Sequence, residues 1–397
     1  MAIDKNLASL TAKLQKKYDN SVVSIASNRT DKDINVHSTG SLMLDLAIGS
    51  ADRAGIPEGR LIELYGPESQ GKTTIALLMI AARQQEEDLK EEQEPSYQKK
   101  ACVFVDAEHA LDFRLAEEYG VDLDQLIYIN PDIAEQSMDI LDAYIRTGSV
   151  GLAIIDSVPS LVPAQVEVAS FEQQHIGVNA RFMSAVCQKL TGPAFKNGTT
   201  LVFINQIREK IGGYSPGGIL ETTPGGRALK FYSTIRMSVR RGDTIKQDGE
   251  QVGHVMRIRV IKNKIASPFK EATINLIYGQ GIDRSDELFQ IALKAKLIKQ
   301  GGAWYSYVNE DGEIKEFNGV PMKSQGKDGM IDFIRTIPEF YVELESIIRG
   351  VKVEADDIPE EEVLAMKEAA TKDEENKSAA AKRAYEKNKK ALEEKKK

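Results

Sequence analysis

The chain has little of what several classes of protein require. Its 397 residues include two cysteines and four histidines, and none of them stands at the spacing of a zinc site or a disulfide framework. No apolar run reaches the roughly 20 residues that a membrane-spanning helix needs, and residues 1–5 show no apolar signal region. These absences predict a cytoplasmic protein without a membrane partner, in which Cys102 and Cys187 are reduced core residues.

What the chain does contain is typical of a globular protein of two or three domains. Hydrophobic residues make up 42% of the chain and charged residues 28%, which is ample material for a core and a solvated surface. The formal net charge of −8 argues against bulk electrostatic attraction to DNA. It leaves room for a local basic path inside the molecule.

The most informative segment is residues 66–74, which fill the pattern G-x-x-x-x-G-K-[ST]. Residues 61–65 predict a buried strand before it and residues 75–81 an apolar helix after it, which is the context that a phosphate-binding loop requires. Backbone N–H groups and the helix N-terminus favour phosphate oxygens, and a lysine and a hydroxyl supply the β/γ-phosphate and Mg²⁺ contacts. The sequence therefore predicts a nucleoside triphosphate site made by Gly66, Pro67, Glu68, Ser69, Gln70, Gly71, Lys72, Thr73 and Thr74.

Two further strands end in carboxylates. Residues 152–155 lead to Asp156, which we expect to hold Mg²⁺, directly or through water, opposite Thr73. Residues 101–105 lead into a carboxylate-rich turn, and the carboxyl ends of strands are where open α/β sheets bind ligands. Glu108 is therefore the predicted general base, with an exposed turn glutamate of no catalytic role as the alternative.

The strand at residues 202–206 delivers two amides to the same edge, and Gln206 is a candidate sensor of the γ-phosphate. A glycine-rich segment follows, from 212 to 226. A long loop without secondary structure inside a compact domain is usually functional or disordered. The basic residues around it predict a loop that becomes ordered on a polyanion; they are Arg208, Lys210, Arg227 and Lys230.

A third basic element, Lys262-Asn263-Lys264, ends another predicted strand. Asn263-Lys264 matches the start of the guanine-reading N-K-x-D pattern, but its fourth position is Ala266, which disfavours a small GTPase. From the residues alone, a solvated strand end is as good an interpretation of the two lysines as a functional one.

The alternation of apolar strand and helix patterns from 40 to 283 predicts an α/β fold with a mostly parallel sheet and crossover helices. Its expected strands are 61–65, 101–105, 126–129, 151–155, 200–204, 233–240, 254–262 and 272–277. Residues 284–350 predict a small α+β domain, with a helix and then a hairpin that turns at Gly312. Beyond 350 the composition becomes acidic and then basic without an apolar stripe, which is typical of a charged flexible tail.

Ahead of this core, residues 5–18 predict an amphipathic helix with Leu7, Leu10 and Leu14 on one face. A lone helix of this length is marginal in water, so its apolar face must dock on its own core or on a neighbouring subunit. The expected division is an N-terminal oligomerisation helix and linker (1–37), an ATPase core (38–283), a small C-terminal domain (284–350) and the tail (351–397).

At this point the residues resemble the bacterial RecA recombinase family, in collinear order from about residue 38 to 310. The runs that carry the resemblance are Ser-Thr-Gly-Ser-Leu (38–42), Gly-Pro-Glu-Ser (66–69), Phe-Val-Asp-Ala-Glu-His-Ala-Leu-Asp (104–112), Phe-Ile-Asn-Gln-Ile-Arg (203–208), Gly-Gly (225–226), Ala-Leu-Lys-Phe-Tyr (228–232), Lys-Asn-Lys-Ile-Ala (262–266) and Gly-Ala-Trp-Tyr-Ser-Tyr (302–307). The resemblance implies a P-loop RecA-like ATPase that forms helical filaments on single-stranded DNA. It further implies pairing with homologous duplex DNA, strand exchange and ATP hydrolysis stimulated by DNA.

In that family ATP lies between neighbouring subunits, and the resemblance assigns a role to each matching residue. Glu108 matches the catalytic glutamate and Gln206 the γ-phosphate sensor. Lys262 and Lys264 match lysines that reach the neighbour's γ-phosphate. Asp112 matches an aspartate beside the adenine.

Contacts with other subunits and with DNA follow from the same resemblance. The helix with Leu7, Leu10 and Leu14 resembles the arm that docks on the adjacent core, and Phe231 matches a residue that relays the nucleotide state. The DNA-binding loops correspond to about 168–176 and 207–225, and residues 284–350 to a domain that receives duplex DNA. The implied DNA contacts are Phe171, Ile176, Arg181, Arg208, Lys210, Gly225, Gly226 and Arg227.

Some positions depart from the family pattern. Leu115 stands where an aromatic residue usually stacks on adenine, the first DNA loop lacks glycines, and the tail is not purely acidic. These departures suggest a divergent bacterial or phage-encoded member. Partners implied by the resemblance are a self-cleaving repressor, a single-strand-binding protein and loader proteins. The alternatives are a ring helicase of the same fold, or a filament scaffold without strand exchange.

Overall fold

A computed structural model of the protein describes residues 4–18, 23–24, 34–50, 53–168, 177–215, 218–247, 249–309, 311–317 and 319–350. The chain divides into two compact units, Met1–Val36 and His37–Lys397. In the first unit, α1 (Lys5–Tyr18) is the predicted amphipathic helix, and none of its residues is buried. Its leucine face is therefore not packed within that unit.

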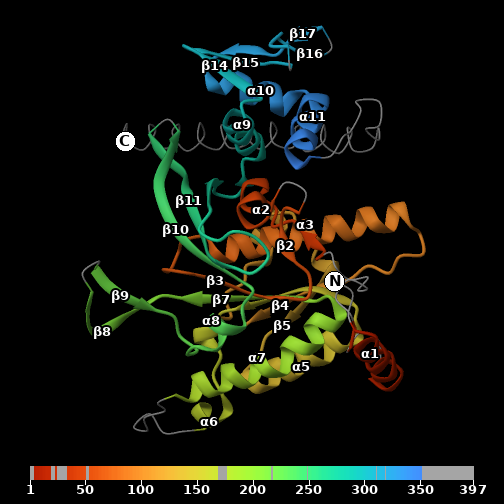
Figure 1. Ribbon diagram of the computed structural model, residues 1–397. Coiled ribbons are helices and arrows are strands. Elements are labelled where there is room, and N and C mark those ends of the chain that lie inside the picture. The colour runs from red at the N-terminus through yellow and green to blue at the C-terminus, as the bar shows by residue number, and fades with distance from the viewer. Residues whose placement is uncertain are drawn as a thin grey trace, which may run out of the picture. The chain divides into compact units, whose positions relative to one another are not determined.

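The second unit is built on the predicted, mostly parallel sheet (Figure 1). In spatial order the sheet consists of β13 (Gly281–Ile282), β12 (Glu271–Ile277), β11 (Glu250–Asn263), β10 (Ile235–Gln247), β3 (Leu61–Gly66), β7 (Thr200–Gln206), β6 (Val150–Asp156), β4 (Ala101–Asp106) and β5 (Leu126–Ile129). From β10 to β5 neighbouring strands run parallel, whereas β10 to β13 pair antiparallel at one side. Every strand predicted between 61 and 277 is present in it.

Helices cover both faces of this sheet, as the continuous apolar runs of its central strands require. α3 (Lys72–Gln93) lies on one face, with α5 (Ala134–Thr147) and α7 (Val178–Asn197) on the other (Figure 1). Successive residues of one strand point to opposite faces, so Phe104 joins the core under α3 while Val105 joins the core under α5 and α7. The sheet thus holds the ends of β3, β4, β6 and β7 at one common edge.

The glycine-rich segment after Gln206 differs from the expected loop. Strands β8 (Arg208–Ser215) and β9 (Gly218–Thr222) form an antiparallel hairpin, with Arg208 opposite Thr222 and Tyr214 opposite Ile219. Glycine lacks the side chain on which an alternating strand pattern depends, so this segment carries no strand signal in its sequence. Backbone hydrogen bonds between the strands supply the order instead.

Residues 284–350 combine three helices with short strands. The hairpin expected at Gly312 is only partly correct. Across this turn the chain makes one isolated bridge, Val308–Ile314, whereas β15 (Trp304–Tyr307) pairs with β14 (Ile298–Gly301) before it and with β18 (Lys323–Gln325) later in the chain. A separate short pair forms between β16 (Glu316–Phe317) and β17 (Val320–Pro321). The elements are α9 (Arg284–Lys294), β14 (Ile298–Gly301), β15 (Trp304–Tyr307), β16 (Glu316–Phe317), β17 (Val320–Pro321), β18 (Lys323–Gln325), α10 (Lys327–Thr336) and α11 (Pro338–Arg349).

The remaining elements connect these parts. They are β1 (Val36–His37), α2 (Leu42–Ile48), β2 (Ile56–Pro57), α4 (Phe113–Glu118), η2 (Leu123–Gln125), η3 (Val158–Ser160), α6 (Ala164–Glu167) and α8 (Ala228–Tyr232). Among the described helices, none is both long enough and apolar enough to cross a membrane.

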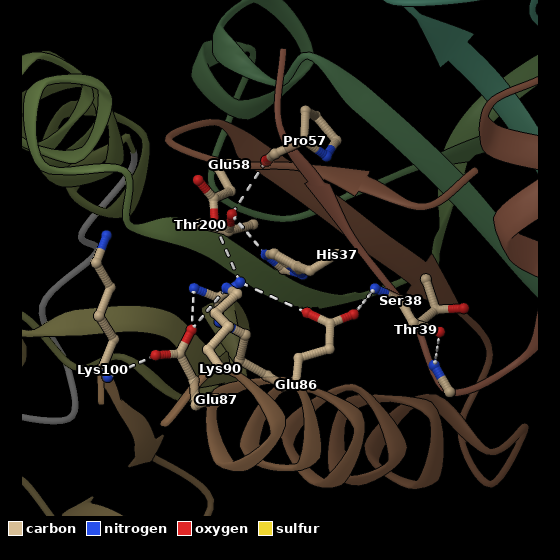
Figure 2. Close-up of polar contacts among 12 residues, drawn as sticks. His37, Ser38, Thr39, Pro57, Glu58, Glu86, Glu87, Lys90, Lys100 and Thr200 are labelled. Atoms are coloured by element: carbon tan, nitrogen blue, oxygen red, sulfur yellow. Dashed lines mark hydrogen bonds and ion pairs between the residues drawn. The ribbon is translucent and has the colours of Figure 1, made fainter. Parts of the chain in front are cut away.

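A buried polar cluster joins α3 to β1, β2 and β7 (Figure 2). The Arg83 guanidinium, whose side chain is 1% exposed, lies 3.0 Å from a Glu58 carboxylate oxygen and 2.7 Å from Glu87 Oε1. His37 is also buried, and its Nε2 lies 3.0 Å from Thr200 Oγ1. Burial holds the pKa of His37 well below its usual range, and the positive charges of Arg83 and Lys90 lower it further.

His37 is therefore expected to make the fold less stable in acid. Because the pKa of His37 is lowered in the folded state, the unfolded chain binds a proton on this residue near pH 6.5 while the folded chain does not. The free energy of unfolding is therefore unaffected by His37 above that pH and decreases as pH falls below it. Between pH 6.5 and 5.5, the free energy of unfolding of His37→Gln should fall less than that of the wild type, by up to roughly 1.4 kcal/mol. Urea unfolding at constant ionic strength measures this difference.

An exposed histidine gives the matched control for that experiment. His109 has a positive φ of 55°, which asparagine tolerates, so His109→Asn removes a histidine without strain. Its pH dependence should follow the wild type. Burial raises the pKa of Glu287 to about 7, which gives an opposite slope in the same range, but this contribution is common to all three proteins. Parallel curves for wild type and His37→Gln would contradict the expectation.

Candidate functional site

The phosphate loop connects β3 to α3. Gly71 caps the helix with φ 87°, in the left-handed region, and a Cβ at this position would lie 2.5 Å from Met256 Sδ. Only glycine meets both conditions, so the second glycine of the motif is required by the fold as well as by phosphate. Ser69 also has a positive φ, 56°. The backbone between β3 and α3 therefore curls in the manner of an anion-binding loop.

Lys72 and Thr73 open α3 at the floor of the site. Lys72 is 8% exposed, and its Nζ donates a hydrogen bond of 2.6 Å to the carbonyl of Pro67. Burial lowers the pKa of Lys72, and Asp156 and Glu108 partly oppose that effect. The Thr73 hydroxyl donates to Asp156 Oδ2 at 2.7 Å across the loop. The predicted opposition of Thr73 and Asp156 is thus present in the geometry.

Around these residues lies a pocket of about 770 Å³. It collects side chains from the ends of β4, β6 and β7 and from β11 and β12 on the other side of the phosphate loop. Its lining consists of Glu68, Ser69, Gln70, Gly71, Lys72, Thr73, Thr74, Ala107, Glu108, Tyr119, Asp156, Ser160, Gln206, His254, Leu276 and Tyr278. Ten of these are residues that the sequence analysis had assigned to nucleotide binding or hydrolysis.

Glu108 is exposed at the end of β4 and is held by two side chains. Its Oε1 accepts a hydrogen bond from the Ser157 hydroxyl and lies 3.4 Å from Gln206 Nε2. Asp106 organises the turn before it, since its carboxylate accepts from the backbone N–H groups of Glu108 at 3.2 Å and of Leu111 at 3.0 Å. A carboxylate in this position can accept a proton inside the pocket.

Asp156 has the environment of a cation ligand. Burial raises its pKa to about 6, and the nearby carboxylates of Glu108 and Asp106 act in the same direction, against the Thr73 hydrogen bond and Lys72. A bound cation would relieve this repulsion between acids. The donor atoms that face each other, the Thr73 hydroxyl and the Asp156 carboxylate, are the hard oxygens that Mg²⁺ prefers. The residues present therefore fit a magnesium ion.

Five of the predicted nucleotide residues do not line this pocket: Gly66 and Pro67 at the start of the phosphate loop, and Asp112, Lys262 and Lys264. The Asp112 carboxylate caps α4, accepting from Arg114 N at 2.9 Å. Lys262 Nζ donates to the carbonyls of Lys230 at 2.7 Å and Phe231 at 3.0 Å, and Lys264 is exposed. Lys262 and Lys264 are expected to act on a neighbour's nucleotide and need not enter their own pocket. The roles of these two lysines and of Asp112 stay predictions.

The predicted DNA contacts fall in three groups. Arg181, Arg208 and Arg227 are exposed. Gly225 and Gly226 both have positive φ at the exit of the hairpin. Phe171, Ile176 and the Lys210 side chain lie outside the part that the structure describes.

The subunit-contact residues that the sequence analysis named are accessible. Leu7 is 56% exposed, Leu10 50% and Phe231 69%, while Leu14 is partly covered. Exposed large apolar side chains of this kind are typical of surfaces that pack against another molecule.

The sequence analysis missed several groups around the pocket. His254 and Tyr278 line it from β11 and the end of β12, with His254 Nδ1 3.2 Å from the Tyr278 hydroxyl. Ser157 and Ser160 complete the surroundings of Glu108. Of these residues, only Ser157 could have been found from the sequence, because it follows the predicted cation ligand Asp156 directly. The others come from strands and turns whose proximity depends on the folded sheet.

The fold and the pocket together define a P-loop ATPase: a parallel sheet, a phosphate loop between β3 and α3, a buried cation-type carboxylate and a candidate base. The family model described as RecA N-terminal domain matches residues 5–283. A curated relative, Protein RecA of Heliobacterium modesticaldum (strain ATCC 51547 / Ice1), is 42% identical over 317 residues, which cover 80% of this chain and 84% of that protein.

The chain belongs to the bacterial RecA family. It is accordingly a DNA-dependent ATPase of homologous recombination. The family membership favours recombination over the ring-helicase alternative, and it confirms the resemblance found in residues 38–310.

Proposed function

We propose that this pocket hydrolyses ATP with Mg²⁺ at the contact between neighbouring subunits of a filament on single-stranded DNA. The observation that supports the proposal most strongly is the gathering of a phosphate loop, a cation-type carboxylate and a hydrogen-bonded glutamate around one pocket. The position of each group relative to the others matches the needs of phosphoryl transfer to water.

We assign the following roles to the residues of the pocket. The Lys72 ammonium leaves the Pro67 carbonyl to contact the β- and γ-phosphates. Thr73 and Asp156 hold Mg²⁺, which neutralises charge on the phosphate oxygens when bound. Glu108 takes the proton of the water that attacks the γ-phosphorus, while the bond to the bridging oxygen of ADP breaks. Gln206, 3.4 Å from Glu108, contacts the γ-phosphate and loses that contact after hydrolysis.

DNA binding is assigned to the β8–β9 hairpin and to residues 168–176. Exposed arginines flank both segments, among them Arg181, Arg208 and Arg227. Contacts of this kind fall mainly on phosphates, so binding should weaken with salt and depend little on base sequence. The glycines at 225 and 226 shape the end of the hairpin, and Phe171 and Ile176 are assigned to the bases.

Filament assembly requires a second copy of the chain. In this proposal α1 docks its leucine face on the next core, Lys262 and Lys264 reach the next subunit's γ-phosphate, and Phe231 transmits the nucleotide state. Residues 1–37, 38–283, 284–350 and 351–397 act as docking arm, ATPase core, duplex-receiving domain and charged tail. A self-cleaving repressor, a single-strand-binding protein and loader proteins are proposed partners.

The substitution Leu7→Lys tests the proposed assembly. A lysine in the apolar stripe of α1 opposes burial against a neighbour, so filaments on single-stranded DNA should be lost. DNA-stimulated hydrolysis should fall at least about tenfold, because the proposed pocket is completed by another subunit. Electron microscopy and phosphate release with and without poly-thymidine DNA measure both effects.

The matched control is Ser9→Lys, which adds the same charge on the opposite side of α1, and it should resemble the wild type. Equal filaments in both variants would overturn the docking role of the helix. Wild-type hydrolysis that ignores single-stranded DNA would overturn the coupled function itself and favour the scaffold alternative.

A further inference from the structure

A buried amide joins three parts of the molecule that the proposed function treats separately. Asn205, fully buried at the end of β7, donates from Nδ2 to Glu63 Oε1 at 3.0 Å and to the Pro224 carbonyl at 3.1 Å. Its Oδ1 accepts from the backbone N–H of Gln206 at 2.9 Å. Both sides of the amide are therefore occupied, and all three partners belong to different functional segments.

The first partner anchors the amide to the phosphate-loop strand. Glu63 is 0% exposed and lies in β3, three residues before Gly66. Its second oxygen pairs with Arg236, whose guanidinium lies 4.7 Å from the Tyr65 ring centroid. A buried carboxylate that is paired on both oxygens has little freedom to move, so Asn205 is attached to a fixed point.

The second partner is the exit of the β8–β9 hairpin. Pro224 follows β9 by two residues, and Gly225 next to it has φ 79°. A Cβ at Gly225 would lie 2.9 Å from Val158 and 3.1 Å from Met183, so the exit is packed closely against η3 and α7. A displacement of the hairpin must therefore act on the Pro224 carbonyl and on the amide that holds it.

The third partner is the proposed phosphate sensor. Gln206 lines the pocket and points its side chain to Glu108, whereas Asn205 does not line the pocket. One side chain thus spans from the base of the hairpin to the backbone of the sensor without contacting the nucleotide itself. A change in the position of Asn205 would therefore affect all three segments at once.

We propose that Asn205 is a positioning residue that couples DNA binding at the β8–β9 hairpin to Gln206, and through it to ATP hydrolysis. The inference rests on the proposed roles of the hairpin and of Gln206. When the hairpin is held by DNA, the Pro224–Asn205–Gln206 hydrogen bonds place the Gln206 side chain against Glu108 and the γ-phosphate. Without them, hairpin and pocket act independently.

The experiment compares the ratio of hydrolysis rates with and without saturating poly-thymidine single-stranded DNA. In Asn205→Ala this ratio should fall to less than about a fifth of the wild-type ratio. The control is Asn275→Ala, which removes another amide–carboxylate hydrogen bond, the one of 2.6 Å from Asn275 Nδ2 in β12 to Asp286 in α9. Its ratio should stay within about twofold of the wild type, while urea unfolding should detect a loss of stability in both variants.

A second variant separates the links and serves if Asn205→Ala does not fold. The double substitution Glu63→Gln with Asn205→Asp exchanges amide and carboxylate at constant charge. It keeps partners for residue 63 and for the Gln206 N–H but has no donor for the Pro224 carbonyl. A lowered ratio of hydrolysis rates in the double variant supports coupling through Pro224. A ratio equal to that of the wild type, in the double variant or in Asn205→Ala, overturns the proposal. If DNA does not stimulate hydrolysis by the wild type, the proposed function itself is wrong.

Discussion

Replacing Glu108 with glutamine should reduce DNA-stimulated ATP hydrolysis at least about a hundredfold while ATP still binds. Glutamine keeps an oxygen that accepts from the Ser157 hydroxyl, and the turn stays held by Asp106, so the geometry of the site is preserved. What is lost is the ability to take a proton from water. Phosphate release measures the rate, and fluorescence of a labelled nucleotide measures binding.

The control for this substitution is Glu117→Gln, which changes an exposed glutamate of α4 that does not line the pocket. Its rate should equal that of the wild type. Hydrolysis by Glu108→Gln within threefold of the wild type would remove Glu108 as the base. The remaining carboxylates that line the pocket would then be Glu68, in the phosphate loop, and Asp156, at the proposed cation site.

Replacing Lys72 with alanine should reduce hydrolysis about 100- to 1,000-fold and weaken ATP binding as well. The lysine is the one side chain of the phosphate loop that carries positive charge into the pocket, and burial already disfavours its charge before phosphate arrives. A bound phosphate would therefore place a negative charge beside a buried ammonium group whose positive charge is otherwise only partly balanced. Nucleotide titration and steady-state rates, both with saturating single-stranded DNA, measure the two effects.

Lys99→Ala gives the corresponding control, because Lys99, in the segment between α3 and β4, pairs with Asp88 and Glu91 in the last turns of α3. Exposed pairs of that kind contribute little to stability, and the residue does not line the pocket. Its kinetics should match the wild type. If Lys72→Ala retained more than a tenth of wild-type hydrolysis, phosphate binding would have to depend on the backbone of the loop alone.

Much of the fold could be predicted because its signals are local. The buried strands at 61–65, 101–105 and 151–155 are continuous apolar runs, and the phosphate loop carries its own pattern of glycine, lysine and hydroxyl. Since carboxyl ends of parallel strands meet at one edge, Glu108, Asp156 and Gln206 could be placed together before any coordinates. The pocket lining agrees with that placement, although the catalytic roles themselves stay predictions.

The rest depends on partners that are distant in the chain. Asn205 was recognised as an amide at a strand end, but Glu63 lies 142 residues away, and no local pattern reveals the hydrogen bond between them. The β8–β9 hairpin escaped prediction because its glycines leave no alternation of apolar and polar side chains. His254 was visible only as an isolated histidine, and its place in the pocket follows from the antiparallel pairing of β11 with β12.

The buried cluster around Arg83 has a consequence for motion. α3 has 22 residues, so it is roughly 33 Å long, and Arg83 lies about 17 Å from its first turn. The ion pair with Glu58, which lies outside α3, and the close approach of Gly151, which leaves 2.8 Å between Arg83 Nε and an added Cβ, oppose sliding of the helix along its axis. The phosphate-binding end of α3 is therefore the stationary wall of the pocket. Any rearrangement between ATP and ADP must take place opposite it, in the Glu108 turn and the hairpin after β7.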